Sequence, residues 1–257
     1  MATSLSSVDN ALRLVHVLAQ REEVGVAEAG RLLGVARSTA HRLLASLVVH
    51  GFAEQDPGTR TYRAGGALLE FGLATVRRYD VRAHARPFLE ALAERTGETT
   101  HLLVLAGADT LFLDSVEGGQ SVRTTGRVGA SFPAHTTSGG KALLAELDTA
   151  ALRGLYPEAQ LAVLTDRTLA TRDALEDELA TVRERGYAVN AGESDPHIAS
   201  VAAAVRDASG AARFAISVSM PAFRAEPQRV AEALIEACVE AGRTIPSPPG
   251  GSAPPAG

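Results

Sequence analysis

The chain has 257 residues, 46% hydrophobic and 21% charged, which is the composition of a folded globular protein. At roughly 150 residues per domain, this length predicts one large or two modest domains. No apolar run approaches the ~20 residues of a membrane helix, and the N-terminus lacks the basic and apolar regions of a secretory signal. The single cysteine, Cys238, excludes an internal disulfide and a multi-cysteine zinc site. We therefore expect a cytoplasmic protein.

Charge is distributed unevenly along the chain. The net charge of −5, from 25 basic and 30 acidic residues, by itself argues against nucleic acid as a partner. However, residues 1–78 hold nine arginines and seven acids, a net +2, and the remainder holds 16 basic and 23 acidic residues, a net −7. Asymmetry between segments is a better guide to partners than the total. The sequence thus predicts a small basic module on an acidic body.

The first ~63 residues predict three short helices and a hairpin. Apolar residues at helical spacing predict the first helix, and a second is expected over 26–33, ended by Gly34. The turn residues Asp56, Pro57 and Gly58 separate two β-prone segments and predict the hairpin. The apolar residues of the first and third helices are Val8, Ala11, Leu12, Val15 and Leu18, and Ala40, Leu43, Leu44 and Leu47, respectively.

The remainder alternates groups of strands with groups of helices. This order predicts an α+β domain with a largely antiparallel sheet. The tail over 246–257 contains five Pro and three Gly and is expected to be disordered. Helices are expected at 66–78, 81–95, 140–146, 149–155, 171–185 and 227–243, and strands at 99–106, 110–116, 122–125, 187–190, 198–205 and 211–219.

The second and third helices, joined by a tight turn, form a helix-turn-helix pattern. The polar face of the third helix carries short donors and a guanidinium near its N-terminus, the end that enters the major groove in this motif. An arginine can read guanine, and hydroxyl groups can hold phosphates. The alternative is an ordinary three-helix core with a solvated face. The predicted DNA-binding residues are Arg37, Ser38, Thr39, His41 and Arg42 on the helix, and Arg60 and Arg63 on the hairpin.

Two groups of segments resemble the IclR-type transcriptional regulators. The segments of the first half are 7–13 (SVDNALR), 34–44 (GVARSTAHRLL) and 62–65 (YRAG). Those of the second half are 127–129 (RVG), 133–142 (PAHTTSGGKA), 184–187 (ERGY), 205–210 (VRDASG) and 216–219 (ISVS). They occur in the family's order over about residues 5–245.

The resemblance implies a domain plan and a function. It implies a winged helix-turn-helix domain over 1–65, a linker helix over 66–79, and an effector-binding domain over 80–245 with a curved antiparallel sheet flanked by helices. Family members are mostly homodimers or dimers of dimers that bind palindromic double-stranded DNA operators. Many are repressors, and a small organic acid or related metabolite commonly changes their affinity for the operator. The chain is therefore expected to be such a regulator, with no cofactor.

The resemblance also implies an effector pocket. The residues carried over to it are Gly129, Ala134, His135, Asn190, Ser200, Ser217 and Ser219. Independently, Ser217 and Ser219 are two apart on a strand and share one face with Ala215, which suits a small polar ligand unless that face meets solvent. The chain departs from the family at Asn190, often an acid, at Ser200, often Cys, at His197, often Gly, and at Ala204, often Pro. We expect a small carboxylate or neutral metabolite; Arg123 and Arg127 either pair with its carboxylate or lie at the surface.

The competing interpretation is a metabolite-converting enzyme in the C-terminal domain, with the N-terminal module serving assembly. Residues 138–141 fit S-x-x-K, but the K-T-G element of those enzymes needs a second lysine, and Lys141 is the only one. The same segment fails as a phosphate loop. No paired histidine spacing predicts a metal site, although dispersed His101, His135 and His197 leave one open. Cys238 is expected to be packed among apolar neighbours rather than to act as a nucleophile. We therefore expect no catalysis.

Overall fold

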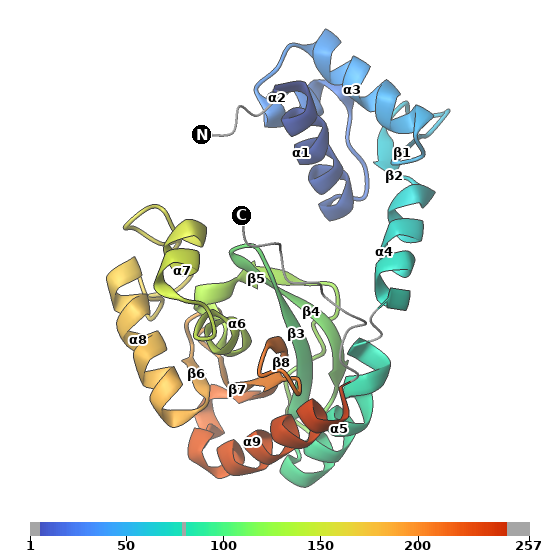
Figure 1. Cartoon of the computed structure of the whole chain (residues 1–257). Coiled ribbons are helices and arrows are strands. Elements are labelled where there is room, and N and C mark those ends of the chain that lie inside the picture. The colour runs from blue at the N-terminus through green and yellow to red at the C-terminus, as the bar shows by residue number, and fades with distance from the viewer. Residues whose placement is uncertain (1–5, 79–80, 246–257) are drawn as a thin grey trace, which may run out of the picture. The chain divides into compact units, whose positions relative to one another are not determined.

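A computed structural model describes residues 6–78 and 81–245. The chain divides into two compact units, Met1–Asp80 and Val81–Gly257 (Figure 1). The disorder predicted for 246–257 concerns residues outside the described ranges. Within those ranges no single helix is long and apolar enough to cross a membrane. Only α2 (Val26–Leu33) and α3 (Arg37–Val49) taken together meet that test of length and composition, and the pair is bent by 107°.

The first unit is a small helical core with a two-stranded hairpin. The 107° bend between α2 and α3 is the geometry of a helix-turn-helix. Gly34 makes the turn possible because it adopts φ 68°, a left-handed conformation that glycine accepts without strain. Besides α2 and α3, the elements of this unit are α1 (Ser6–Gln20), β1 (Ala53–Gln55), β2 (Tyr62–Ala64) and α4 (Gly66–Arg78).

The core of the first unit anchors the hairpin to the helices. Leu14, Leu18 and Leu44 are fully buried, as the spacing on α3 predicts for Leu44. Tyr62 on β2 joins this core, and its backbone exchanges two hydrogen bonds with Val24 at 2.8 and 2.9 Å. The β1–β2 hairpin, which is the wing of this helix-turn-helix unit, is thus fixed relative to α3. Val8, in contrast, is 53% exposed on α1.

The second unit is a curled antiparallel sheet with helices on both faces (Figure 1). The strand order is β5-β4-β3-β8-β7-β6, and every neighbouring pair is antiparallel. The strands are β3 (Thr99–Ala106), β4 (Asp109–Val116), β5 (Ser131–Pro133), β6 (Ala188–Ala191), β7 (Ile198–Arg206) and β8 (Ala212–Pro221). The α-helices are α5 (Val81–Thr96), α6 (Ser138–Leu144), α7 (Thr149–Leu155), α8 (Arg172–Arg185) and α9 (Pro227–Thr244), with short 3-10 turns η1 (Ala134–Thr136) and η2 (Ala222–Arg224).

Alternation along the strands assigns each side chain to one face of the sheet. On one face, α5 and α9 pack against β3 and β7: Thr100 donates to the Leu89 carbonyl and Cys238 to the Ala203 carbonyl. On the other face, Ala202 and Ala215 join the core of α6, α7 and α8. From Phe214 onward every residue of β8 is buried, whereas Ala212 and Arg213 at its start are partly exposed. The sheet is therefore covered on both sides, and the face of β8 that carries Ser217 and Ser219 does not meet solvent.

The strand predicted over 122–125 is wrong. That segment is irregular. The edge strand next to β4 is instead β5, which lies further along the chain at Ser131–Pro133. Thr124 is held by its side chain and carbonyl instead: its hydroxyl donates to the Ser219 carbonyl at 3.2 Å, and its carbonyl accepts from the Thr99 hydroxyl at 2.7 Å. These bonds hold the segment across the ends of β3 and β8 rather than alongside β4.

Candidate functional site

The predicted DNA-binding side chains all lie on the surface of the first unit. Arg37, Ser38, Thr39, His41 and Arg42 are exposed on the first two turns of α3. The opposite side of the same turns carries Ala40, which is fully buried. The amides at the start of α3 lie at the positive end of the helix dipole, which favours a phosphate. The surface therefore combines groups for base edges and for phosphates at one helix end.

The two wing arginines differ in their surroundings. Arg63 on β2 pairs with Glu54 on β1, with two nitrogens 3.1 and 3.2 Å from the same carboxylate oxygen. Arg60 lies in the hairpin tip with φ 60°, a left-handed conformation that is uncommon outside glycine. Asp56 organises this tip by accepting the Gly58 and Thr59 amides, both at 2.8 Å, and those bonds lower the pKa of its carboxyl. Arg60 is thereby presented outward at the tip, next to a partly neutralised Arg63.

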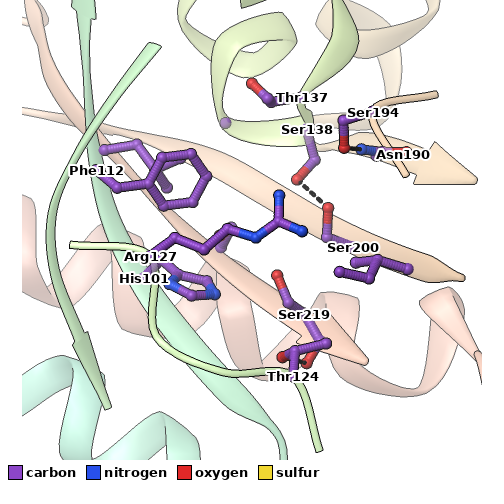
Figure 2. A pocket seen from close by; sticks show the side chains of 14 residues that line it. His101, Phe112, Thr124, Arg127, Thr137, Ser138, Asn190, Ser194, Ser200 and Ser219 are labelled. Atoms are coloured by element: carbon purple, nitrogen blue, oxygen red, sulfur yellow. Dashed lines mark hydrogen bonds between the residues drawn. The ribbon is translucent and has the colours of Figure 1, made fainter. Parts of the chain in front are cut away.

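The second unit contains a small polar cavity between the sheet and α6 (Figure 2). Antiparallel register brings its floor together, because His101 pairs with Ser217 and Ser200 pairs with Ser219. Its volume is about 20 Å³, room for one or two water molecules. The cavity is lined by His101, Leu103, Phe112, Thr124, Arg127, Thr137, Ser138, Gly139, Asn190, Ser194, Ile198, Ser200, Ser217 and Ser219.

Four of the seven effector residues expected from the resemblance line this cavity, and three do not. Asn190, Ser200, Ser217 and Ser219 are brought together there. Gly129 is exposed in a turn, and Ala134 is buried in the core beneath α6. His135 lies in a different groove, where its Nε2 is 2.9 Å from the Ala162 carbonyl and burial lowers its pKa. A resemblance in sequence indicates which segments lie near the cavity, but not which of their side chains point into it.

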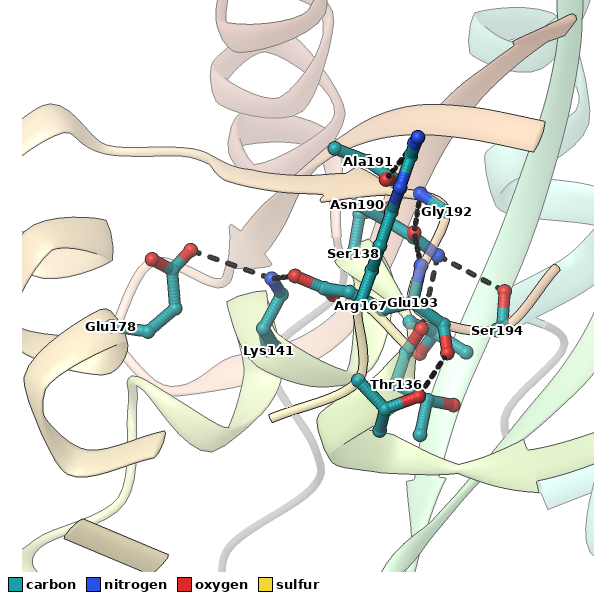
Figure 3. A network of polar contacts seen from close by, with 12 residues as sticks. Thr136, Ser138, Lys141, Arg167, Glu178, Asn190, Ala191, Gly192, Glu193 and Ser194 are labelled. Atoms are coloured by element: carbon teal, nitrogen blue, oxygen red, sulfur yellow. Dashed lines mark hydrogen bonds and ion pairs between the residues drawn. The ribbon is translucent and has the colours of Figure 1, made fainter. Parts of the chain in front are cut away.

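Asn190 has no hydrogen-bonding capacity left for a ligand. Its Oδ1 accepts from the Gly192 and Glu193 amides, and its Nδ2 donates to the Thr136 carbonyl and the Ser194 hydroxyl (Figure 3). Two acceptor and two donor sites are the full complement of a carboxamide. Asn190 therefore shapes the cavity by tying the loop after β6 to η1, just before α6. A carboxylate at this position would meet the Thr136 carbonyl without a proton to donate.

The structure places two further residues in the cavity, Arg127 and His101, whose roles the sequence patterns left open. Arg127 projects into the cavity, whereas Arg123 is exposed and pairs with Glu117 at 2.9 Å (Figure 2). His101 is 1% exposed, and its Nδ1 has no hydrogen-bond partner among the described residues. Burial, and then the Arg127 charge, lower the pKa of His101 to about 4, so the ring is neutral at physiological pH. Residues 99–106 consist of three polar residues followed by five apolar ones, so no alternation in the sequence marked His101 as facing the cavity.

Behind the cavity, a buried ion-pair network fixes α6 to α8 and to the loop after β6 (Figure 3). The Lys141 amine is fully buried, 2.8 Å from Glu193 and 3.4 Å from Glu178, and Arg185 also reaches Glu178 at 2.9 Å. Burial raises the pKa of Glu193 despite the adjacent amine. Ser138 bonds instead to Ser200 at 2.7 Å. Thus residues 138–141 do not form a serine–lysine nucleophile pair.

Metal-binding geometry is not formed by the described residues. No three His, Cys, Asp or Glu side chains within 6–78 and 81–245 gather closely enough to hold an ion. His101 lines the cavity, His135 lies in the separate groove, and His197 is exposed. The three histidines are therefore dispersed in space as well as in sequence.

Comparison with known proteins assigns the class that this fold and these sites define. Residues 7–57 match the IclR helix-turn-helix domain, and residues 73–247 match the family described as "Bacterial transcriptional regulator IclR C-terminal". The chain belongs to the IclR family of transcriptional regulators. The resemblance proposed from the sequence and the α+β fold with an N-terminal helix-turn-helix are confirmed.

Individual relatives share most of the chain's length. It is 34% identical over 228 residues to the HTH-type transcriptional regulator XynR of Escherichia coli K12, which covers 88% of this chain and 90% of XynR. It is 29% identical over 231 residues to the transcriptional repressor IclR of the same organism, covering 89% and 84% of the two chains. An IclR homolog from Microbacterium hydrocarbonoxydans, solved in complex with 4-hydroxybenzoate, matches with a TM-score of 0.73 at 26% identity, covering 93% and 97%.

Proposed function

We propose that this family member is a cytoplasmic, non-catalytic repressor that binds a palindromic operator as a homodimer or a dimer of dimers. In this proposal α3 and the wing read the DNA. A small organic acid binds at the cavity between the sheet and α6 (the Arg127 cavity), which widens from about 20 Å³ to admit it, and this binding changes the affinity for the operator. The observation that supports this proposal is that one chain contains both an exposed basic helix end and a buried polar cavity. The name of the E. coli repressor supports the sign of regulation.

Two states with different ligand preferences are sufficient for such control. A ligand shifts the equilibrium only by the difference between its affinities for the two states. The same coupling free energy acts in reverse, so operator DNA would weaken ligand binding by the same factor. The 4-hydroxybenzoate complex of the Microbacterium homolog supports a carboxylate ligand in this fold.

Self-association is supported by apolar side chains on the surface of the first unit. Val8 and Leu12 on α1 are 53% and 59% exposed, four residues apart on one helix face. Burying such a stripe against a second copy would remove apolar area from water. A two-fold symmetric pair would present two α3 helices to half-sites whose spacing matches the dimer.

The salt dependence of duplex binding tests the proposed function. In a gel-shift titration with the DNA next to the chain's own gene, specific binding is expected to weaken steeply between about 50 and 200 mM salt, because phosphate contacts release counterions. A scrambled duplex is the control for specificity. Absence of any duplex binding at 50 mM salt would contradict the proposal and favour the enzyme alternative, which no comparison supports.

Replacing Arg42 by alanine is expected to weaken operator binding by about 1–3 kcal/mol, with relaxed base preference at one position of each half-site. Arg42 is exposed beside buried Ala40, so its loss leaves the helical core intact. Arg229→Ala is a matched control, since Arg229 is a surface arginine on α9 in the second unit. Equal operator affinity of Arg42→Ala and Arg229→Ala would remove Arg42 from the reading surface.

A further inference from the structure

The Arg127 cavity is closed in this structure and has to open before an organic molecule can enter it. Its volume of about 20 Å³ holds only one or two water molecules. Four parts of the second unit form its walls: the sheet, the start of α6, the loop after β6 (192–197), and the segment before β5 that carries Thr124 and Arg127. The bonds that hold each part show which of them is free to move.

The sheet and α6 are fixed by the core. The floor of the cavity lies on β3, β8 and β7, each of which has a neighbouring strand on both sides. All seven residues of α6 are buried. A Cβ on Gly139 would lie 2.9 Å from the Leu103 side chain, so the helix rests directly on β3. Neither wall can move outward without disrupting the core of the second unit.

The loop after β6 is fixed by several hydrogen bonds from different elements. Thr165 donates to the Gly192 carbonyl and Thr168 to the Glu193 carbonyl, both at 2.7 Å. The Glu193 carboxylate accepts from the buried Lys141 amine at 2.8 Å. The Asn190 side chain accepts from the amides of Gly192 and Glu193. This wall would have to break a buried ion pair as well as these bonds in order to open.

The segment before β5 is held much more weakly. Over residues 123–128, which we call the strap, Thr124 is the only buried residue. Among the described residues, one of the six backbone amides of the strap has an acceptor, the Gly126 amide, which lies 3.4 Å from a Glu117 carboxylate oxygen. A segment with an exposed backbone and few hydrogen bonds opens at low free-energy cost.

The chain is anchored on both sides of the strap. The Val122 carbonyl accepts from the Arg224 guanidinium at 2.6 Å, and Arg224 in turn pairs with Glu98. On the other side, the Gly129 amide donates to the Phe112 carbonyl at 2.8 Å. Movement of the strap is therefore confined to the six residues between these two points.

Two residues hold the strap over the cavity. Thr124 makes the stronger contacts, because its hydroxyl donates to the Ser219 carbonyl at 3.2 Å and its carbonyl accepts from the Thr99 hydroxyl at 2.7 Å. Arg127 has only an ion pair with Asp195, at 3.6 Å, which is longer than a hydrogen bond. Figure 2 shows Thr124 on the side of the cavity opposite Ser138 and Ser194.

The Arg127 side chain favours opening of the strap. Its guanidinium carbon lies 4.8 Å from the centre of the Phe132 ring, and its side chain is 21% exposed. Within the part of the chain that the structure describes, none of its N–H groups has a hydrogen-bond acceptor. A partly buried charge without such partners gains hydration when it moves into water. Opening therefore offsets part of the loss of the two Thr124 hydrogen bonds.

We propose that the strap is the gate of the Arg127 cavity. It moves outward between Val122 and Gly129 while the other three walls stay in place, and the two hydrogen bonds of Thr124 keep it closed. The opening motion follows from the contacts of the second unit alone. Its use as the entrance for an effector rests on the proposed function.

Cysteine labelling of the full chain tests the gate without a ligand. Ser217 lines the cavity, is 2% exposed and makes no side-chain hydrogen bond with another described residue, so Ser217→Cys places a reporter thiol beneath the strap. Iodoacetamide, a small solute, reaches that thiol only when the cavity opens. The native Cys238, buried on the opposite face of the sheet under α9, is an internal control for opening of the whole unit. Peptide mapping reads the two sites separately.

The bond between Thr124 and Ser219 is tested by Thr124→Val in the Ser217→Cys background. Valine keeps the branched shape but loses the hydroxyl, so labelling at position 217 is expected to accelerate about two- to tenfold, as the loss of one hydrogen bond implies. The labelling rate follows the open population when opening is fast relative to labelling. Labelling of Cys238 is expected to stay unchanged. Thr125→Val, at an exposed neighbour without a hydrogen bond to another described residue, should label as the parent does.

Thr165→Val tests the opposite wall. It removes the bond to the Gly192 carbonyl, but Thr168, Asn190 and Lys141 still hold the loop after β6. This variant is therefore expected to accelerate labelling less than Thr124→Val does. Equal or faster labelling of Thr165→Val would show that the loop after β6 is the entrance and would overturn the proposal.

Two further results would also contradict the gate: an unchanged rate in Thr124→Val, or a parallel rise at Cys238, which would mean that the whole unit opens. Thermal unfolding shows whether each variant is folded, and Ser219→Cys on the same face is a second reporter if Ser217→Cys is not. Duplex binding reports on the proposed function separately. A chain that labels as expected but binds no duplex would overturn the proposed function and leave the gate in place.

Discussion

Replacing Lys141 by methionine is expected to lower the free energy of unfolding of the second unit by about 3–5 kcal/mol, because it leaves a buried carboxylate without its cation. Glu193 loses its only ion-pair partner among the described residues, and its Oε2 already lacks a hydrogen bond there. Glu178 keeps Arg185 at 2.9 Å and contributes less to the loss. Chemical denaturation followed by circular dichroism measures the change.

The same variant carries a pH signature. Burial raises the pKa of Glu193 above the ordinary 4.5, and Lys141 opposes that rise. A carboxyl whose pKa is higher in the folded state stabilises the fold below its unfolded pKa, and this stability is lost as pH rises through the folded pKa. Without Lys141 the pKa rises further. The deficit relative to wild type should therefore shrink from pH 7 to pH 5.

Arg153→Met provides the matched control for Lys141→Met. Arg153 also pairs with a carboxylate, Glu176, at 2.9 Å, but it is exposed. Exposed ion pairs contribute little to stability, so this variant should unfold close to wild type at both pH values. A Lys141→Met protein as stable as Arg153→Met at pH 7 would show that the buried network is not required for folding.

Replacing Gly140 by alanine is expected to destabilise the second unit by about 3 kcal/mol, at the upper end of overpacking costs. A Cβ at this position would overlap the Ala134 carbonyl oxygen and the Thr110 hydroxyl, so η1 or β4 has to move away from α6. Because α6 supplies one wall of the Arg127 cavity, ligand binding should weaken along with stability. Thermal unfolding, and titration with a small organic acid that binds the wild-type chain, measure the two effects.

Gly154→Ala is the corresponding control for Gly140→Ala. Gly154 is also helical, in α7, and a Cβ there meets nothing within 4 Å. Alanine is the better helix former by about 1 kcal/mol, so this variant should be as stable as wild type or slightly more stable. If both alanine variants behaved alike, the close contact of α6 with η1 would have no energetic consequence.

Local patterns predicted most helices and strands of this chain. The helices over 26–33, 66–78 and 149–155 have the predicted bounds, because apolar spacing and the turn at Gly34 act within a few residues. The helix expected over 140–146 begins earlier, at Ser138, because the Thr137 hydroxyl accepts from the Gly140 amide. The segment 122–125 has strand-like composition, but whether it forms the edge strand of the sheet depends on which segment pairs with β4. That depends on tertiary structure.

The cavity was less predictable than the elements that form it. Two-residue periodicity correctly placed Ser217 and Ser219 on one face, since strand geometry alone decides this. The direction of the Arg127 side chain depends on how the loop before β5 folds over the sheet. The sequence alone therefore did not distinguish Arg127 from the nearby Arg123 as a residue of the cavity. The internal role of Asn190 depends on the Thr136 carbonyl, 54 positions away in sequence. Such contacts follow from the closed fold and have no local pattern.

Because its only lysine is buried, the folded chain has an unusual reactivity toward reagents that modify amines. All other basic side chains are arginine or histidine, so an acyl group or an amine-reactive dye finds no lysine at the surface of the native protein. The Lys141 ε-amine becomes reactive only when α6 separates from Glu193 and Glu178. The N-terminal α-amine reacts as well, so labelling has to be read at Lys141 itself by peptide mapping. The rate of labelling there would report opening of the second unit without any engineered probe.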